Sequence, residues 1–314
     1  MKYYIGLDIG GTKCAVTVGT ADQNSIQILE KYKFNTVPDN PDKILAIFTG
    51  KIKEYEKQYA ISGIGISCGG PLDIEKGVVL SPPNLPGWDK IPVKDYFQNT
   101  FFCPVYLQND ANACAVAEWK YGAGKGCQNM IFMTFGTGLG AGLILNGHLY
   151  SGTNGMAGEL GHWRIADDGP MGYGKSGSFE GFCSGSGIAS AAKQAALSGK
   201  CQELLRQAGS VEAITAKLVS DLAKAGDRDC LEIYAQSGRM LGRGLSLLID
   251  LLNPQVIVIG SIFTRSRNLL WEQIKNVVDR ETLPQNNSSC EIRTAALGEQ
   301  IGDYAAIAVA TGAF

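Results

Sequence analysis

The stretch YYIGLDIGGTKCAVTV, residues 3–18, decides the fold. Its first seven residues are apolar enough for a buried strand, Gly10-Gly11-Thr12 is a strong turn signal, and a second strand follows. The same order returns at residues 130–145, where two strand-like runs flank Gly136-Thr137-Gly138. Two strand–turn–strand units about 125 residues apart predict duplicated lobes.

The rest of the chain predicts an α/β fold. Val256-Ile-Val-Ile259 is a continuous apolar run, which is typical of a central buried strand. Other strands are expected at 26–29, 64–66 and 105–107, several of them in hairpins. Apolar residues at helical spacing predict helices at 42–59, 111–119, 211–225, 229–252, 269–278 and 301–310.

Composition excludes several classes of protein. Of 314 residues, 45% are hydrophobic and 18% are charged, which is typical of a folded protein. The length exceeds the roughly 250–300 residues at which one core stops growing, so two lobes are expected. A formal net charge of −2 gives no basis for binding nucleic acid or an anionic membrane surface.

Cysteine usage and apolar patterning indicate a location. The nine cysteines are scattered and form no C-x-x-C pair, which is typical of reduced, buried thiols. The chain reaches Asp8 before any apolar signal segment, and Asp250 and Asn253-Pro254 interrupt the apolar stretch at 245–259. We therefore expect a cytoplasmic protein without a membrane span.

The two glycine turns suit phosphate. Backbone N–H groups in a tight glycine turn can surround phosphate oxygens, and the missing Cβ lets a ligand approach closely. Thr12 adds a hydroxyl, Lys13 adds a cation, and Asp8 can hold a metal-bound water. An ordinary hairpin explains a single such turn at least as well. The second copy at 136–138 favours two phosphate grips around one cleft.

Asn109-Asp-Ala-Asn112 begins a helix directly after a strand. Asp110 suits the N-cap position of that helix. A carboxylate at this place in a cleft can also accept the proton of a hydroxyl that attacks a γ-phosphoryl group. The two roles are compatible, because the helix-start amides would keep the carboxylate ionised.

Glu159-Leu-Gly-His162 places a carboxylate and an imidazole three residues apart in a glycine-rich segment. The chain has only two histidines, and no cysteine pair lies near this segment, so a zinc site is not favoured. The two side chains can instead hold adjacent hydroxyl groups. Asn84, in the proline-rich residues 81–88, either does the same or lies in a surface turn.

Five motifs resemble those of the ROK family of bacterial sugar kinases and related repressors. They are Asp8-Ile-Gly-Gly-Thr-Lys13, Pro83-Asn-Leu-Pro-Gly-Trp88, Asn109-Asp-Ala-Asn112, Phe135-Gly-Thr-Gly-Leu-Gly140 and Gly158-Glu-Leu-Gly-His162. The resemblance implies a two-lobed actin-like ATPase fold, which is a duplicated ribonuclease H-like architecture with a cleft between the lobes. By it, residues 1–113 with 301–314 form the small lobe, and residues 114–300 form the large one.

The resemblance also implies roles for single residues. Asp110 would be the base that activates the sugar 6-hydroxyl, and Asp8 would lie near Mg²⁺ through water. The other sugar ligands would be Asn84, Asn109, Glu159, His162 and Glu180. The ATP ligands would be Gly10, Gly11, Thr12, Lys13, Gly136, Thr137, Gly138 and Gly260.

Two stretches depart from the family. Members usually carry a zinc motif, C-x-C-G-x-x-G-C-x-E, whereas residues 171–180 here are MGYGKSGSFE. Met171, Tyr173 and Ser178 stand where thiolates would, so no zinc is expected. The P-loop-like pattern at 169–176 lacks the long preceding strand that such a loop needs. Residues 302–306, GDYAA, differ from the usual small-residue pattern.

These observations lead to one expected function and two alternatives. The expected function is ATP- and Mg²⁺-dependent phosphorylation of the 6-hydroxyl of a hexose or N-acetylhexosamine. The partners would be the sugar and ATP, with no nucleic acid or membrane, and the family suggests a homodimer. The alternatives are a sugar-responsive ROK-type transcriptional regulator and a catalytically silent sugar-binding protein.

Overall fold

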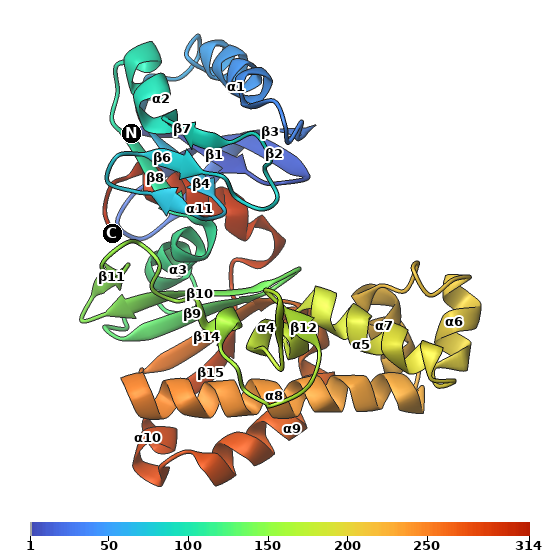
Figure 1. The fold of residues 1–314 in the computed structure, drawn as a ribbon. Helices are drawn as coiled ribbons and strands as arrows, with labels where there is room; N and C mark the ends of the chain where they lie inside the picture. Colours follow the sequence, from blue (N-terminus) through green and yellow to red (C-terminus); the bar gives the residue numbers. More distant parts are fainter. Residues whose placement is uncertain (1) are drawn as a thin grey trace. The chain divides into compact units, whose positions relative to one another are not determined.

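Both expected strand–turn–strand units are present in the computed structural model, which describes residues 2–314. The first consists of β1 (Tyr3–Ile9) and β2 (Lys13–Ala21), and the second of β9 (Met130–Phe135) and β10 (Leu139–Leu145). The described chain forms two compact units (Figure 1). The first unit comprises the residues up to Phe132 with Gly142–Ala157 and Ala296–Phe314; the second comprises Met133–Ala141 and Gly158–Ala295. The lobe boundaries expected from the sequence stay predictions.

A five-stranded sheet forms the centre of the first unit, in the order β3-β2-β1-β4-β8. Its other members are β3 (Ile26–Asn35), β4 (Ile61–Cys68) and β8 (Val105–Asn109). Strands β1, β2 and β3 run antiparallel, whereas β4 pairs in parallel with both β1 and β8. The three parallel strands therefore end at one edge, where Ile9, Cys68 and Asn109 lie in register.

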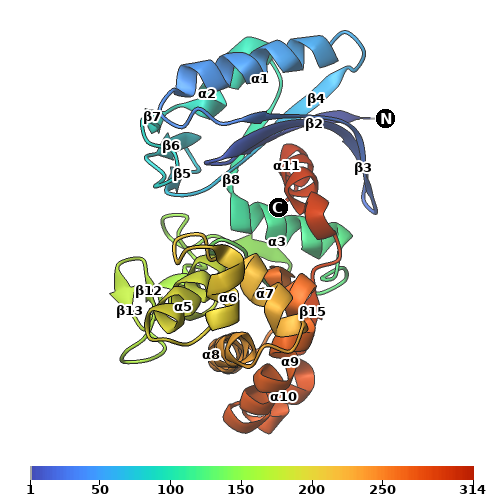
Figure 2. The same cartoon turned by 90° about the vertical axis from the view of Figure 1, so that its right-hand side faces the viewer.

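Helices cover both faces of this sheet (Figure 2). Helices α1 (Pro41–Tyr55) and α2 (Val93–Phe101) lie on one face; α3 (Asp110–Tyr121) and α11 (Ile301–Ala310) lie on the other, after the short η2 (Gly298–Gln300). Buried side chains such as Leu7, Phe48 and Phe97 fill the first interface. A small sheet of β5 (Leu72–Asp73), β6 (Val78–Leu80) and β7 (Asp89–Ile91) precedes α2.

Helix α11 packs directly against glycines of the sheet. A Cβ on Gly65 of β4 would lie 2.2 Å from the Ala306 carbonyl oxygen and 2.3 Å from the Ala310 nitrogen. On β1, a Cβ on Gly6 would lie 2.8 Å from the Cβ of Ala306. The small residues of the expected helix at 301–310 thus allow backbone to pack on backbone.

The second sheet has the order β11-β10-β9-β14-β15. Its remaining strands are β11 (His148–Tyr150), β14 (Val256–Ser261) and β15 (Glu291–Thr294). Strand β14 is buried from residue 256 to residue 260 and pairs in parallel with β15. The prediction of a buried strand at 256–259 with neighbours on both sides is confirmed.

The second unit also contains helices and one hairpin. In chain order they are η1 (Leu160–His162), β12 (Met171–Gly172), β13 (Lys175–Ser176), α4 (Phe179–Phe182), α5 (Gly185–Leu197), α6 (Gln202–Ala208), α7 (Ala216–Lys224), α8 (Arg228–Leu252), α9 (Ile262–Glu281) and α10 (Pro284–Ser289). The P-loop-like pattern falls in the β12–β13 hairpin, so it has no P-loop structure. Within residues 2–314, no helix is long and apolar enough to cross a membrane.

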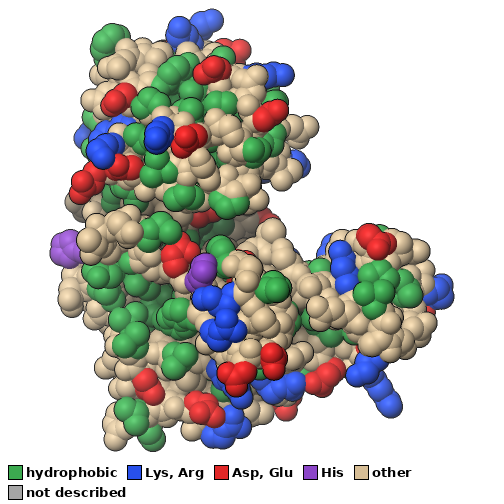
Figure 3. All heavy atoms as spheres, viewed as in Figure 1, with side chains coloured by type: hydrophobic (Ala, Val, Ile, Leu, Met, Phe, Trp, Pro, Cys, Tyr) green, Lys and Arg blue, Asp and Glu red, His purple; other side chains and the backbone are tan. Residues whose placement is uncertain are grey.

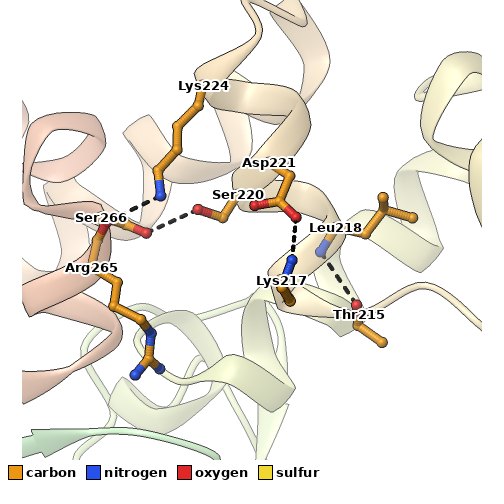
Figure 4. Close-up of polar contacts among 8 residues, drawn as sticks. All are labelled: Thr215, Lys217, Leu218, Ser220, Asp221, Lys224, Arg265 and Ser266. Carbon is orange, nitrogen blue, oxygen red and sulfur yellow. Dashed lines mark hydrogen bonds and ion pairs between the residues drawn. The ribbon is translucent and has the colours of Figure 1, made fainter. Parts of the chain in front are cut away.

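The helix expected at 211–225 begins only at Ala216. Thr215 takes the N-cap, and its Oγ1 accepts a hydrogen bond from the Leu218 nitrogen at 3.3 Å (Figure 4). A side-chain cap of this kind satisfies an amide that has no partner within the helix. Periodicity alone therefore overextended the helix at its start.

The helix expected at 269–278 is longer and kinked. It begins at Ile262, and Ser266 has non-helical backbone (φ −131°, ψ 23°). Ser266 Oγ bonds Ser220 Oγ of α7 at 2.9 Å, and Lys224 Nζ donates to the Arg265 carbonyl at 3.1 Å (Figure 4). The lysine thereby satisfies a carbonyl beside the kink.

Candidate functional site

In the first unit, Asp8, Asn109 and Asp110 lie along the edge where the parallel strands end. Asp8 is the penultimate residue of β1, and Asn109 is the last residue of β8. Strand β4 lies between these two strands. The charge of Asp110 contributes to raising the pKa of Asp8, so the two carboxylates act on each other across this edge.

Asn109, and not Asp110, caps helix α3. Its side-chain oxygen accepts hydrogen bonds from the nitrogens of Ala111 at 3.0 Å and Asn112 at 3.4 Å. The prediction that Asp110 takes the N-cap is therefore wrong. Asp110 is the first helical residue, and its Oδ1 accepts a hydrogen bond from the Ala111 nitrogen at 2.8 Å. The Asp110 carboxylate is held at the helix start by two backbone amides, that of Ala111 and its own.

Both carboxyl groups have raised pKa values. Burial raises the pKa of Asp110, and the hydrogen bond from Ala111 opposes this shift without cancelling it. The Asp110 side chain reaches solvent, yet protein atoms crowd its carboxyl group enough for desolvation to dominate. The pKa of Asp8 rises to about 6, first through burial and then through the charges of Asp110 and Asp303. The helix-start amides lower the pKa of Asp110, as the sequence predicts, but burial has the larger effect.

A cavity of about 200 Å³ opens beside Asp8. Lys13, Lys31, Lys33 and Asp303 line it, and Asp303 forms an ion pair with Lys31. Lys13 is among the expected phosphate ligands, whereas the other three were not predicted at this site. Lys31 and Lys33 share one face of β3, a spacing that the sequence displays. Only the folded chain brings Asp303 of α11 to the same place.

The first glycine turn packs on the loop that carries Asn84. A Cβ on Gly11 would lie 2.6 Å from the Asn84 Cβ and 2.8 Å from its carbonyl oxygen. A Cβ on Gly10 would lie 2.6 Å from the Lys13 carbonyl oxygen. Both glycines are therefore needed for packing, and the exposed Asn84 side chain lies beside the turn. Two separately predicted sites, the phosphate turn and Asn84, are neighbours.

In the second unit, Glu180 lies against the second glycine turn. Its Oε2 accepts a hydrogen bond from the Leu139 nitrogen at 2.9 Å, and a Cβ on Gly138 would lie 2.6 Å from the same oxygen. Ser178 caps α4, the helix of Glu180, by accepting from the Gly181 nitrogen at 3.1 Å. The serine at a position expected for a zinc thiolate thus stabilises the helix that holds Glu180.

The same turn meets the end of β14 and the start of α5. The Gly185 nitrogen donates to the Gly136 carbonyl at 2.8 Å, and the Ser186 nitrogen donates to the Thr137 carbonyl at 3.2 Å. A Cβ on Gly136 would lie 3.6 Å from Oγ of Ser261, which follows Gly260. The predicted nucleotide residues of this unit are therefore adjacent. Ser261, which no sequence motif indicates, has a positive φ of 59° at this junction.

Glu159, which precedes η1, and His162, the last residue of η1, have exposed side chains. The ring of His162 lies 4.7 Å from the ring of Tyr173, and its Nδ1 is 3.2 Å from Lys175 Nζ. Figure 3 shows a histidine beside Lys and Arg side chains on the visible face. In the described part of the chain, no group of three His, Cys, Asp or Glu is arranged to hold a metal. The expectation that zinc is absent stays a prediction.

Comparison with known proteins agrees with these motifs. The profile of the ROK family matches residues 4–312. Glucokinase of Halalkalibacterium halodurans is 31% identical, over 96% of this chain and 92% of that protein. A ROK family glucokinase from Streptomyces griseus, solved with glucose and AMPPNP, is 30% identical, with a TM-score of 0.81 and 99% of both chains covered. Xylose repressor of Caldicellulosiruptor bescii is 29% identical over 87% of this chain and 69% of that protein.

The family comparison and the two sheets lead to the same conclusion. The chain has the expected α/β, actin-like ATPase fold, in which each of two strand–turn–strand units carries a glycine turn. The profile match extends over nearly all of the sequence. The chain belongs to the ROK family.

Proposed function

We propose that the protein transfers the γ-phosphoryl group of ATP to the 6-hydroxyl of a hexose or N-acetylhexosamine, with Asp110 as the general base. The observation that carries this proposal is the placement of Asp110 at the start of α3, with Asn109 as the cap and Asp8 across the sheet edge. The glucokinases among the relatives support the sugar kinase activity. The choice of sugar and the role of Asp110 are our inference.

Asp110 would accept the proton of the sugar hydroxyl as its oxygen attacks phosphorus. Burial raises the pKa of Asp110 above that of an ordinary aspartate, which makes its carboxylate a stronger proton acceptor. The amide of Ala111 keeps the carboxylate oriented through its 2.8 Å hydrogen bond. Orientation and basicity are what a base contributes to phosphoryl transfer.

The nucleotide would be held by backbone and lysine. In the first unit, Gly10, Gly11 and Thr12 present a turn without bulky side chains, and Lys13, Lys31 and Lys33 add positive charge around the cavity. In the second unit, the turn at 136–138 and Gly260 would serve the same ligand. Mg²⁺, bound to ATP, would neutralise phosphate charge, and Asp8 would act on it through a metal-bound water.

The sugar would be held by groups of complementary type. The Asn109 oxygen is used by the helix cap, so its amide is left to donate to a hydroxyl. The carboxylates of Glu159 and Glu180 accept hydrogen bonds from hydroxyl groups. Asn84 and His162 complete the proposed set. Glu180 also holds the Leu139 amide, which would couple sugar binding to the second glycine turn.

Replacement of Asp110 by Asn tests this proposal. We expect turnover to fall about 10²–10⁴-fold, with sugar affinity little changed, because the amide fills the same space but cannot accept the proton. The measurement is coupled ADP release over a panel of hexoses and amino sugars, with calorimetric sugar binding. Asp42→Asn is the matched control, since Asp42 also lies in the first turn of a helix. Near-normal turnover of Asp110→Asn would refute the base.

The repressor relatives support a second candidate, sugar-responsive regulation of transcription. Sugar binding without phosphorylation of any sugar in the panel would favour either this regulator or a catalytically silent sugar-binding protein. Binding of promoter DNA in a gel-shift experiment, with release of the DNA on addition of sugar, would identify the regulator.

We also propose that the protein is a homodimer located in the cytoplasm. Light scattering tests the dimer.

A further inference from the structure

The ring of His162 is held from two sides by one short hairpin. Strands β12 and β13 pair with Met171 opposite Ser176 and Gly172 opposite Lys175. Tyr173 and Gly174 form the two-residue turn, both with positive φ (52° and 67°), as this hairpin type requires. The hairpin thus presents the Tyr173 ring and the Lys175 ammonium to His162.

Lys175 makes two contacts with His162. Its Nζ lies 3.2 Å from Nδ1 of the ring and donates to the backbone carbonyl of the same residue at 2.6 Å. An ammonium group can only donate, so Nδ1 must accept and carries no proton. The proton of the neutral ring must then be on Nε2. Nε2–H is a hydrogen-bond donor, and a sugar oxygen can accept its hydrogen bond.

The hairpin is itself anchored next to Glu180. A Cβ on Gly172 would lie 2.6 Å from Ser178 Oγ and 2.8 Å from the Gly181 nitrogen, so the hairpin packs on the start of α4. Arg164 donates to the Ser176 carbonyl at 2.8 Å. The ammonium is therefore fixed relative to both η1 and α4.

This donor set does not fit zinc. The hairpin offers Met171, Tyr173 and Lys175, and a structural zinc site needs thiolate, imidazole or carboxylate ligands. The Lys175 ammonium is nevertheless a cation in contact with both Nδ1 and the backbone carbonyl of His162. We propose that Lys175, with Tyr173, is a positioning residue that fixes His162 as the Nε2–H tautomer and so sets the hydrogen bond that His162 donates to the sugar. The sugar half of this proposal rests on the proposed function.

The tautomer can be measured without any sugar. The chain has two histidines, His148 and His162, so ¹⁵N-histidine labelling gives two imidazoles, and His148→Gln assigns them. His148 is an internal control, because its Nδ1 lies 3.0 Å from the Asn146 carbonyl. A carbonyl only accepts, so His148 should be the Nδ1–H tautomer. At a pH at which both rings are neutral, we expect opposite tautomers at the two sites.

Three outcomes decide the positioning role. We expect Nε2–H at His162 in the unsubstituted protein and a mixture of tautomers in Lys175→Met. Addition of Zn²⁺ should leave the His162 signals unchanged. An Nδ1–H tautomer at His162, or a zinc-shifted Nδ1 signal, would overturn the proposal. These readouts stand even if no sugar is phosphorylated, so they fail independently of the proposed function.

Kinetics test the consequence for sugar. Lys175→Met should raise the sugar KM about two- to threefold, because only part of the tautomer mixture then carries Nε2–H, with kcat unchanged. Lys175→Arg keeps a cation that only donates and should retain most of the affinity and the Nε2–H tautomer. Lys217→Met removes an exposed lysine of the same unit, paired with Asp221, and controls for charge. An unchanged KM in a folded Lys175→Met protein would contradict the role in sugar binding.

Discussion

At the residue scale, Asp8 is held in surroundings that disfavour its charge. Its pKa is raised from 3.8 to about 6. Between these two pH values, Asp8 is therefore protonated in the folded protein and ionised in the unfolded chain. Stability from this group is therefore fully present below about pH 4 and is lost as pH rises through about 6. Asp8→Asn should raise the free energy of unfolding at pH 7 by on the order of 2 kcal/mol.

Urea unfolding at pH 7 and pH 4 measures this effect, because the gain in Asp8→Asn should vanish at the lower pH. Asp73 is the opposing control. Hydrogen bonds from Lys76 lower the pKa of Asp73, so Asp73→Asn should give no gain at pH 7. Equal stability of Asp8→Asn and the parent at pH 7 would show that Asp8 is not destabilised by burial. Loss of turnover in Asp8→Asn would place its charge in the reaction.

The residue scale also shows what the sequence can predict about the site. It places Asp8 and Asp110 correctly at the ends of strands, because strand and helix signals meet there. It does not distinguish Asn109 from Asp110 as the cap, since both residue types cap well and the backbone of Asn109 decides. Lys31 and Asp303 escape detection because they are 272 positions apart, and only the packing of α11 on the sheet brings them together.

At the element scale, the contact of α11 with β4 has no room for a methyl group. Gly65→Ala would place Cβ 2.2 Å from the Ala306 carbonyl oxygen, and backbone on both sides cannot move away as a flexible side chain can. We expect a loss of about 3 kcal/mol in the free energy of unfolding. Thermal and urea unfolding of the variant measure it.

Gly50 provides the matched control for Gly65. It lies inside helix α1, where an added Cβ would meet nothing within 4 Å. Gly50→Ala should therefore stabilise the protein by about 0.5–1 kcal/mol. The two substitutions add the same methyl group with opposite expected signs. A neutral Gly65→Ala would contradict the close packing of α11.

Element boundaries follow the same division between local and distant causes. Apolar spacing predicts the existence of α7, α8, α9 and α11, because that spacing is a property of each segment alone. The start of α7 depends on the Thr215 cap, and the kink of α9 depends on Ser220 and Lys224 of another helix. The spacing of apolar residues within a segment carries no information about such partners, so the predicted bounds of these helices differ from the observed ones.

At the scale of the whole molecule, the duplicated strand–turn–strand unit is the strongest sequence signal. It predicts a duplicated architecture, and the structure has two five-stranded sheets, each with a glycine turn between two of its strands. The order of strands around β4 and β14 is not contained in any local pattern, because it depends on crossovers between distant segments. Family motifs supply that order, since they place the chain among proteins of known fold.

The whole fold is expected to form without zinc, so removal of metal should leave it intact. The nine cysteines are free, and residues 2–314 contain no three-ligand cluster, so a chelator should have no structural metal to extract. EDTA should stop turnover by removing Mg²⁺ from ATP, yet change the unfolding midpoint by less than about 2 °C. Mg²⁺ alone should restore full turnover. A structural zinc contributes about 10 kcal/mol or more to folding, so a large fall in the midpoint, reversed only by Zn²⁺, would overturn both this prediction and the role given to Lys175.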